Sequence, residues 1–131
     1  MGIFKQLFQS GRDKKNSNTQ KQKKGEQDGL SEEFHENGQL KMRGNFKDGK
    51  QHGLWEVFHE NGQLDFRMNF KDGELDGLGE SFHKNGQLKV REHWKDGKLN
   101  GLSEYFDNED GNLTSTETWR NGVLEGVNAN P

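Results

Sequence analysis

The chain contains no cysteine, and its single proline, Pro131, is its last residue. Without cysteine there is no disulfide, no thiolate zinc site and no thiol nucleophile, which suits a reducing compartment. Only 26% of the residues are hydrophobic and 31% are charged, so a thick conventional core is not expected. No apolar run approaches the roughly 20 residues that span a bilayer. These absences exclude a disulfide scaffold and a helical membrane protein.

Glycine is abundant instead, with 18 residues, and its spacing shows an internal repeat. The most regular column is Gly29, Gly53, Gly77 and Gly101, at a step of 24, and other columns keep this step except that one inserted residue makes the last step of two columns 25. They are Leu30, Leu54, Leu78 and Leu102; Phe34, Phe58, Phe82 and Phe106; Leu40, Leu64, Leu88 and Leu113; Phe46, Phe70, Trp94 and Trp119. A period in this range indicates one supersecondary unit that has been copied and stacked. The regularity favours an ordered array over the disorder that composition alone suggests.

Each repeat reads as two strands and two turns, because runs of β-forming residues alternate with Asn-Gly and Asp-Gly pairs. A three-residue loop at 60–62 would pair Phe58 with Leu64. By strict alternation it would then place six apolar residues on one face: Leu54, Phe58, Leu64, Phe66, Met68 and Phe70. The same reasoning at 71–73 pairs Phe70 with Glu74. The sequence therefore predicts an all-β fold of tandem hairpins in an elongated, twisted antiparallel meander sheet.

Charge divides the chain into segments. Residues 1–24 carry seven Lys or Arg against Asp13 alone, whereas the rest carries 12 basic and 21 acidic residues. We expect a mostly disordered basic tail at 1–24, a repeat array of about four units at 25–127 and a C-terminal tail at 128–131. The tail begins with apolar residues on one face of a short helix: Ile3, Phe4, Leu7 and Phe8. Phe4, Leu7 and Phe8 are candidate membrane contacts of a weak, salt-sensitive kind, and a leader that only aids solubility is the alternative.

The repeat unit resembles a known family. Gly53-Leu-Trp55, Asn61-Gly62-Gln-Leu64 and Lys71-Asp72-Gly73 are similar to the unit of MORN repeats, and most closely to the bacterial variant of YwqK-type antitoxin proteins. The resemblance covers residues 25–127. The chain departs from that pattern by placing Phe-His where Tyr-Tyr is usual and by lacking Trp in three copies. The resemblance implies the hairpin fold and antitoxin or immunity-like binding of a partner, with a toxin as the expected partner.

Three polar columns run through the repeats. His35, His59 and His83 stand about 10 Å apart on alternate strands, too far to share a metal ion, so exposed turn-flanking histidines are expected. Strand parity places four glutamates on the leucine and phenylalanine face, where they satisfy backbone groups or form an acidic binding stripe: Glu32, Glu56, Glu80 and Glu104. Their spacing does not suit a glycosidase pair. Parity places Arg43, Arg67 and Arg91 on the opposite face, as a solvated surface.

We therefore expect no catalytic, metal or cofactor site, no nucleic-acid partner and no enzyme activity, but a protein–protein interaction module. One layer of sheet cannot cover both of its faces, so large aromatic residues are expected to remain open to a partner. The candidate partner-binding residues are Trp55, Phe66, Phe70, Trp94 and Trp119, together with the glutamate column. A peripheral membrane-associated scaffold, docked through the N-terminus, is the alternative. The expected location is cytoplasmic, with the inner membrane face as the site of any peripheral contact.

Overall fold

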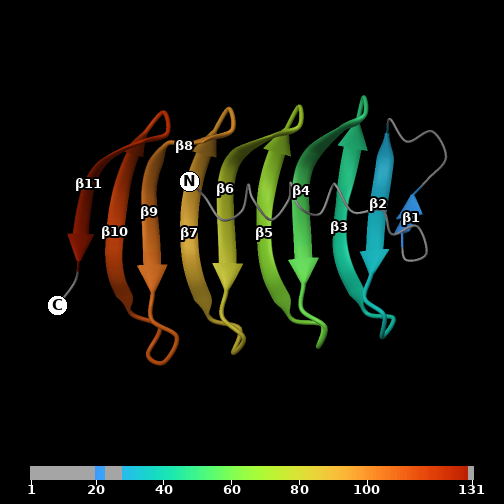
Figure 1. The fold of residues 1–131 in the computed structure, drawn as a ribbon, viewed down its shortest axis with the longest axis horizontal. Coiled ribbons are helices and arrows are strands. Elements are labelled where there is room, and N and C mark those ends of the chain that lie inside the picture. The colour runs from blue at the N-terminus through green and yellow to red at the C-terminus, as the bar shows by residue number, and fades with distance from the viewer. Residues whose placement is uncertain (1–19, 23–27, 130–131) are drawn as a thin grey trace.

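A computed structural model of the chain describes residues 20–22 and 28–129. These residues form eleven strands of one antiparallel sheet and contain no helix. The strands are β1 (Gln20–Gln22), β2 (Gly29–Phe34), β3 (Leu40–Lys47), β4 (Lys50–Phe58), β5 (Leu64–Lys71), β6 (Glu74–Phe82), β7 (Leu88–Lys95), β8 (Lys98–Leu99), β9 (Gly101–Phe106), β10 (Leu113–Arg120) and β11 (Val123–Ala129). They lie side by side in chain order, so the molecule is longest across its strands (Figure 1). The predicted all-β meander is confirmed.

Two kinds of turn recur along the sheet. At Asn37-Gly38, Asn61-Gly62 and Asn85-Gly86 a three-residue loop closes: His59 N donates to Gln63 O at 2.8 Å, and Phe58 pairs with Leu64 as predicted. At Asp72-Gly73 the prediction of a three-residue loop is wrong, because Lys71 pairs with Glu74 and Phe70 with Leu75. Asp72 and Gly73 both have positive φ, at 51° and 84°, which is the type I′ geometry that joins twisted strands through two residues.

A β-bulge beside each of the three-residue Asn-Gly loops changes which residues share a face. Val57 pairs with Phe66 while Phe58 pairs with Leu64, so two residues of β5 oppose one step of β4. Beyond the bulge, Phe66, Met68 and Phe70 therefore lie on the face opposite Leu54 and Phe58. The expectation that all six apolar residues share one face is wrong, because it assumed strict alternation along β5, and the bulge interrupts this alternation between Leu64 and Phe66.

The face that carries Phe66, Met68 and Phe70, here called the aromatic face, holds the core. The buried residues that cluster there are Trp55, Phe66, Met68, Phe70, Leu75, Trp94 and Leu99. Trp55 meets the rings of Phe46 and Phe70 edge-on, at centroid distances of 5.3 and 6.2 Å, and its indole donates to Asn45 O at 3.0 Å. A Cβ on Gly44 would overlap the indole of Trp55, so the missing side chain makes room for the ring.

One strand falls inside segment 1–24, which is expected to be mostly disordered. β1 pairs with β2 through Gln20 with Glu33 and Gln22 with Ser31. The remainder of the basic tail lies outside the described residues, and so do Phe4, Leu7 and Phe8. At the other end β11 extends to Ala129, two residues beyond the predicted end of the array.

Candidate interaction faces

The sheet face opposite the core, here called the leucine face, carries an exposed apolar row. Leu30, Leu54, Leu78 and Leu102 are 39%, 46%, 38% and 40% exposed, whereas Trp55 is 3% exposed. These leucines stand on β2, β4, β6 and β9, so every second strand contributes one side chain. Leu54 and Leu78 lie opposite Asn69 and His93 in the register. The apolar side chains are therefore separated by polar ones, and the row has gaps at regular intervals.

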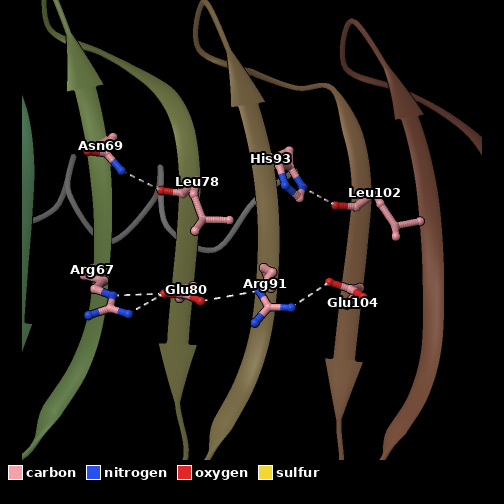
Figure 2. Close-up of polar contacts among 8 residues, drawn as sticks. All are labelled: Arg67, Asn69, Leu78, Glu80, Arg91, His93, Leu102 and Glu104. Atoms are coloured by element: carbon pink, nitrogen blue, oxygen red, sulfur yellow. Dashed lines mark hydrogen bonds and ion pairs between the residues drawn. The ribbon is translucent and has the colours of Figure 1, made fainter.

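Beside the leucines runs a row of alternating charge. Arg43 Nη2 lies 3.0 Å from Glu56 Oε1. Glu80 accepts from Arg67 at 2.9 Å and from Arg91 at 3.4 Å, and Arg91 reaches Glu104 at 3.2 Å (Figure 2). Glu56, Glu80 and Glu104 of the glutamate column therefore do not form an acidic stripe, because arginines neutralise them; Glu32 lies opposite Arg43 in the register. The placement of Arg43, Arg67 and Arg91 on the opposite face was wrong, since the bulge reverses the parity of β3, β5 and β7.

Further contacts hold this surface in a fixed shape. The guanidinium groups of Arg67 and Arg91 lie 5.6 and 5.9 Å from the ring centroids of Phe82 and Phe106, within the range of cation–π attraction. Asn69 Nδ2 donates to Leu78 O at 3.2 Å, and His93 Nδ1 to Leu102 O at 2.9 Å; Figure 2 shows both bonds beside the leucine side chains. Arg67 and Arg91 each have an ion pair and a ring contact, so these side chains lose little further conformational freedom when another surface covers them.

The structure places the predicted aromatic anchors together, but on the buried side. Trp55, Phe66, Phe70 and Trp94 are 3–6% exposed, and Trp119 packs against them, partly buried. The expectation that they leave apolar surface open is wrong for the first four. The spacing of the apolar columns alone did not show which column is buried and which is exposed. The exposed leucine row was therefore missed as a candidate surface.

The histidine column serves the repeat-to-repeat contacts. The ring of His35 donates through Nε2 to Phe58 O at 2.8 Å, and that of His83 to Phe106 O at 3.1 Å. His59 Nε2 lies 3.5 Å from Asp65 Oδ1. All three rings are half-buried, so the expectation of exposed histidines is wrong. Over residues 20–22 and 28–129 no group of three or more His, Cys, Asp or Glu residues is arranged to hold a metal ion.

A buried acidic cluster lies at the β7 to β10 end of the aromatic face. Glu92 is 4% exposed, and burial raises its pKa from 4.5 to about 7, opposed by the neighbouring Trp94 side chain and reinforced by Glu117. The Tyr105 hydroxyl donates to Glu117 Oε1 at 2.8 Å, and Trp119 Nε1 donates to the same oxygen at 3.3 Å. Burial and this hydrogen bond raise the pKa of Tyr105. Glu117 thus has two donors, and Glu92 is the carboxyl that burial favours in its neutral form.

The repeat geometry agrees with the comparison to known families. A family model described as the MORN repeat variant matches residues 27–48, 51–72 and 75–96, together about half of the chain. The chain belongs to the MORN repeat variant family. Repeats of this family are generally associated with interactions with proteins and membranes. The first match begins just before β2, the other two begin at the second residue of β4 and of β6, and each match ends at the aspartate of an Asp-Gly turn. Each matched stretch therefore supplies one leucine of the exposed row, together with one glutamate and one arginine of the charge row.

Solved structures show the same fold. A TarM mutant of S. aureus, determined in complex with Fondaparinux, alpha-GlcNAc-glycerol and UDP, matches 92% of this MORN chain with a TM-score of 0.53 and 15% identity. The match spans 23% of the TarM chain, and at this identity it shows a common sheet architecture alone. The comparison with curated proteins gave no match. Among the described residues, no helix is long and apolar enough to cross a membrane.

Proposed function

We propose that this MORN chain is a non-enzymatic protein–protein interaction module that binds its partner through the leucine face. The observation that carries the proposal is the row of four exposed leucines beside a neutralised charge row, on a sheet whose other face is already buried. Regularly spaced exposed apolar side chains with a polar rim are typical of protein interfaces. The sheet supports them rigidly, so a partner would meet a preformed surface.

The resemblance to YwqK-type repeats supports a narrower form of this function, in which the partner is a toxin and the MORN chain acts as its antitoxin or immunity protein. The formal net charge of −3 suits a basic partner, because opposite net charges speed encounter. In this form the array occupies a surface that the toxin needs, and neutralises it by covering that surface rather than by chemistry. The protein would then act in the cytoplasm, where a toxin produced in the same cell must be held.

The experiment is co-purification of partners with the tagged full chain from its own cells. We expect Leu54→Ser combined with Leu78→Ser to lose a partner that the unchanged chain captures. Val123→Ser combined with Val127→Ser, on β11, is the matched control, because these valines are also exposed, at 64% and 61%. A partner retained equally by all three proteins would refute binding through the leucine face. For the toxin form, the captured protein should stop growth when expressed alone and should be harmless when expressed with the array.

A further inference from the structure

The charges of the row on the leucine face alternate in sign from strand to strand. Across β2, β3, β4, β5, β6, β7 and β9 it reads Glu32, Arg43, Glu56, Arg67, Glu80, Arg91, Glu104, with one charge on each strand. Neighbouring strands are about 4.8 Å apart, so the sign changes at that spacing along the row. The positions from Arg43 to Glu104, read from the other end, are Glu, Arg, Glu, Arg, Glu, Arg. The reversed order of these six positions is therefore their charge complement, and Glu32 lies outside them.

A twofold axis parallel to the strands, between β5 and β6, produces this reversal when two copies meet leucine face to leucine face. The rotation inverts the order of strands but keeps the height of each residue along its strand. Arg67 of one copy then faces Glu80 of the other, and Arg43 faces Glu104. Glu56 faces Arg91, so no position in the row meets a like charge. An unrelated surface would need the same alternation at the same spacing to match it equally well.

The same rotation also fits the leucines together. The leucines stand on every second strand, about 10 Å apart, and the axis shifts each one onto a strand of the other copy that carries none. Leu54 of one copy reaches β7 of the other, opposite His93 and between Leu78 and Leu102. Leu54, Leu78 and Leu102 of each copy therefore enter the gaps of the other row, and Leu30 lies against β10 at its end. Apolar surface that is about 40% exposed in one copy becomes covered.

Sheet twist does not oppose this arrangement. A rotation about an axis that runs along a strand carries a twisted sheet onto a surface of the same twist and hand, so the two faces run parallel rather than diverging. Sheets that pack face to face in this aligned way stand about 10 Å apart. That separation suits interdigitated leucines, and it leaves room for an arginine to reach a carboxylate across the interface.

We propose that the leucine face binds a second copy of this MORN chain, in a twofold dimer that pairs Arg43 with Glu104 across the interface. The proposal rests on the proposed function, because it names the protein that occupies the leucine face. A foreign partner and the second copy would compete for the same leucines, so capture of a partner would separate the dimer into single chains.

The test uses charge reversal at two positions that cannot compensate within one chain. Arg43 and Glu104 lie on β3 and β9, five strands or about 24 Å apart. Sedimentation velocity at micromolar concentration should show a dimer for the unchanged chain. Arg43→Glu or Glu104→Arg alone should raise the dissociation constant of the dimer by about tenfold or more, because each substitution puts like charges opposite one another across the interface. Mixing the two single variants should restore dimers, since each altered residue then meets its complement. The chain with both substitutions should also dimerise.

Two results would refute the dimer. One is an unchanged chain that stays monomeric up to about 0.1 mM. The other is a mixture of the single variants that stays monomeric while circular dichroism shows that both variants are folded. If the single variants do not fold, the leucine and valine double variants described under the proposed function replace them. A dimer that persists in the variant with Leu54→Ser and Leu78→Ser, but is lost in the variant with Val123→Ser and Val127→Ser, is joined through β11. That result refutes dimerisation through the leucine face. If the unchanged chain is monomeric and its capture of a partner still depends on the leucines, the dimer alone is refuted. If the chain is dimeric and its captured partner is retained by the leucine variant, the proposed function is refuted.

Discussion

Replacing Glu92 by glutamine tests the energetics of the buried acidic cluster. Glu92 points from β7 into the aromatic face, and burial raises its pKa from 4.5 to about 7. Each pKa unit between folded and unfolded states corresponds to about 1.4 kcal/mol. The shift therefore corresponds to a penalty of about 3 kcal/mol for holding the ionised carboxylate in the folded protein. Glutamine keeps the shape of the side chain and cannot ionise.

The direction of the pH dependence follows from proton binding. Below pH 4.5 the carboxyl is protonated in both states, so it costs nothing. Between pH 4.5 and about 7 the unfolded chain releases the proton while the folded chain retains it, and the free energy of unfolding falls as pH rises. Above pH 7 both states are ionised and the full penalty applies. Glu92 thus contributes stability that is present in acid and lost as pH rises through the pKa of the folded state.

Urea unfolding followed by tryptophan fluorescence, at pH 4.5, 6 and 8, measures the effect. We expect Glu92→Gln to be about 2–3 kcal/mol more stable than the unchanged chain at pH 8 and to equal it within about 0.5 kcal/mol at pH 4.5. Glu74→Gln, on the exposed start of β6, is the control and should show no such gain. A glutamine variant that is less stable than the unchanged chain at pH 8 would show that the ionised carboxylate is stabilised in the fold, contrary to this reasoning.

Two further substitutions test the core and the tail. Gly44→Ala should destabilise the protein by about 1–3 kcal/mol, because the added Cβ meets the indole of Trp55. Gly126→Ala, where a Cβ meets nothing within 4 Å, should change thermal stability little, and equal losses would contradict the close packing of Trp55. Phe4→Ser combined with Phe8→Ser in the full chain should reduce co-sedimentation with anionic vesicles at low salt. Unchanged co-sedimentation would count against membrane contact through the N-terminus.

The repeat, the strands and the meander could all be predicted from the sequence, because they depend on local signals. Glycine and aromatic columns at one spacing are visible in the chain itself, and the Asn-Gly loop followed from the need to pair Phe58 with Leu64. The type I′ turn at Asp72-Gly73 was missed although Asp-Gly is typical of it, since the three-residue solution was extended to both turns. Turn type depends on φ at two residues, and neighbouring columns constrain it only indirectly.

The two faces could not be assigned from the sequence for a physical reason. A single bulge near Leu64 exchanges every later side chain of β5 between the faces, so the error at one residue moved Arg67 away from Glu80 and Phe66 away from the core. Hydrophobic alternation did not correct it, because both faces of this sheet carry an apolar column. The leucine column and the tryptophans differ in exposure, which composition does not record.

The hydrogen bonds between successive repeats have a consequence for how such an array can change in length. Asn37 and Asn85 each donate from Nδ2 to the backbone oxygen 23 residues further on, and the rings of His35 and His83 do the same. The acceptor is always a main-chain carbonyl, which every amino acid supplies. These four bonds therefore make no demand on the side chains of the following copy. Duplicating or deleting one whole unit would keep such acceptors in place, and the junction would keep its ion pair as well wherever the new neighbour carries the glutamate that its arginine meets, as Glu80 does for Arg67.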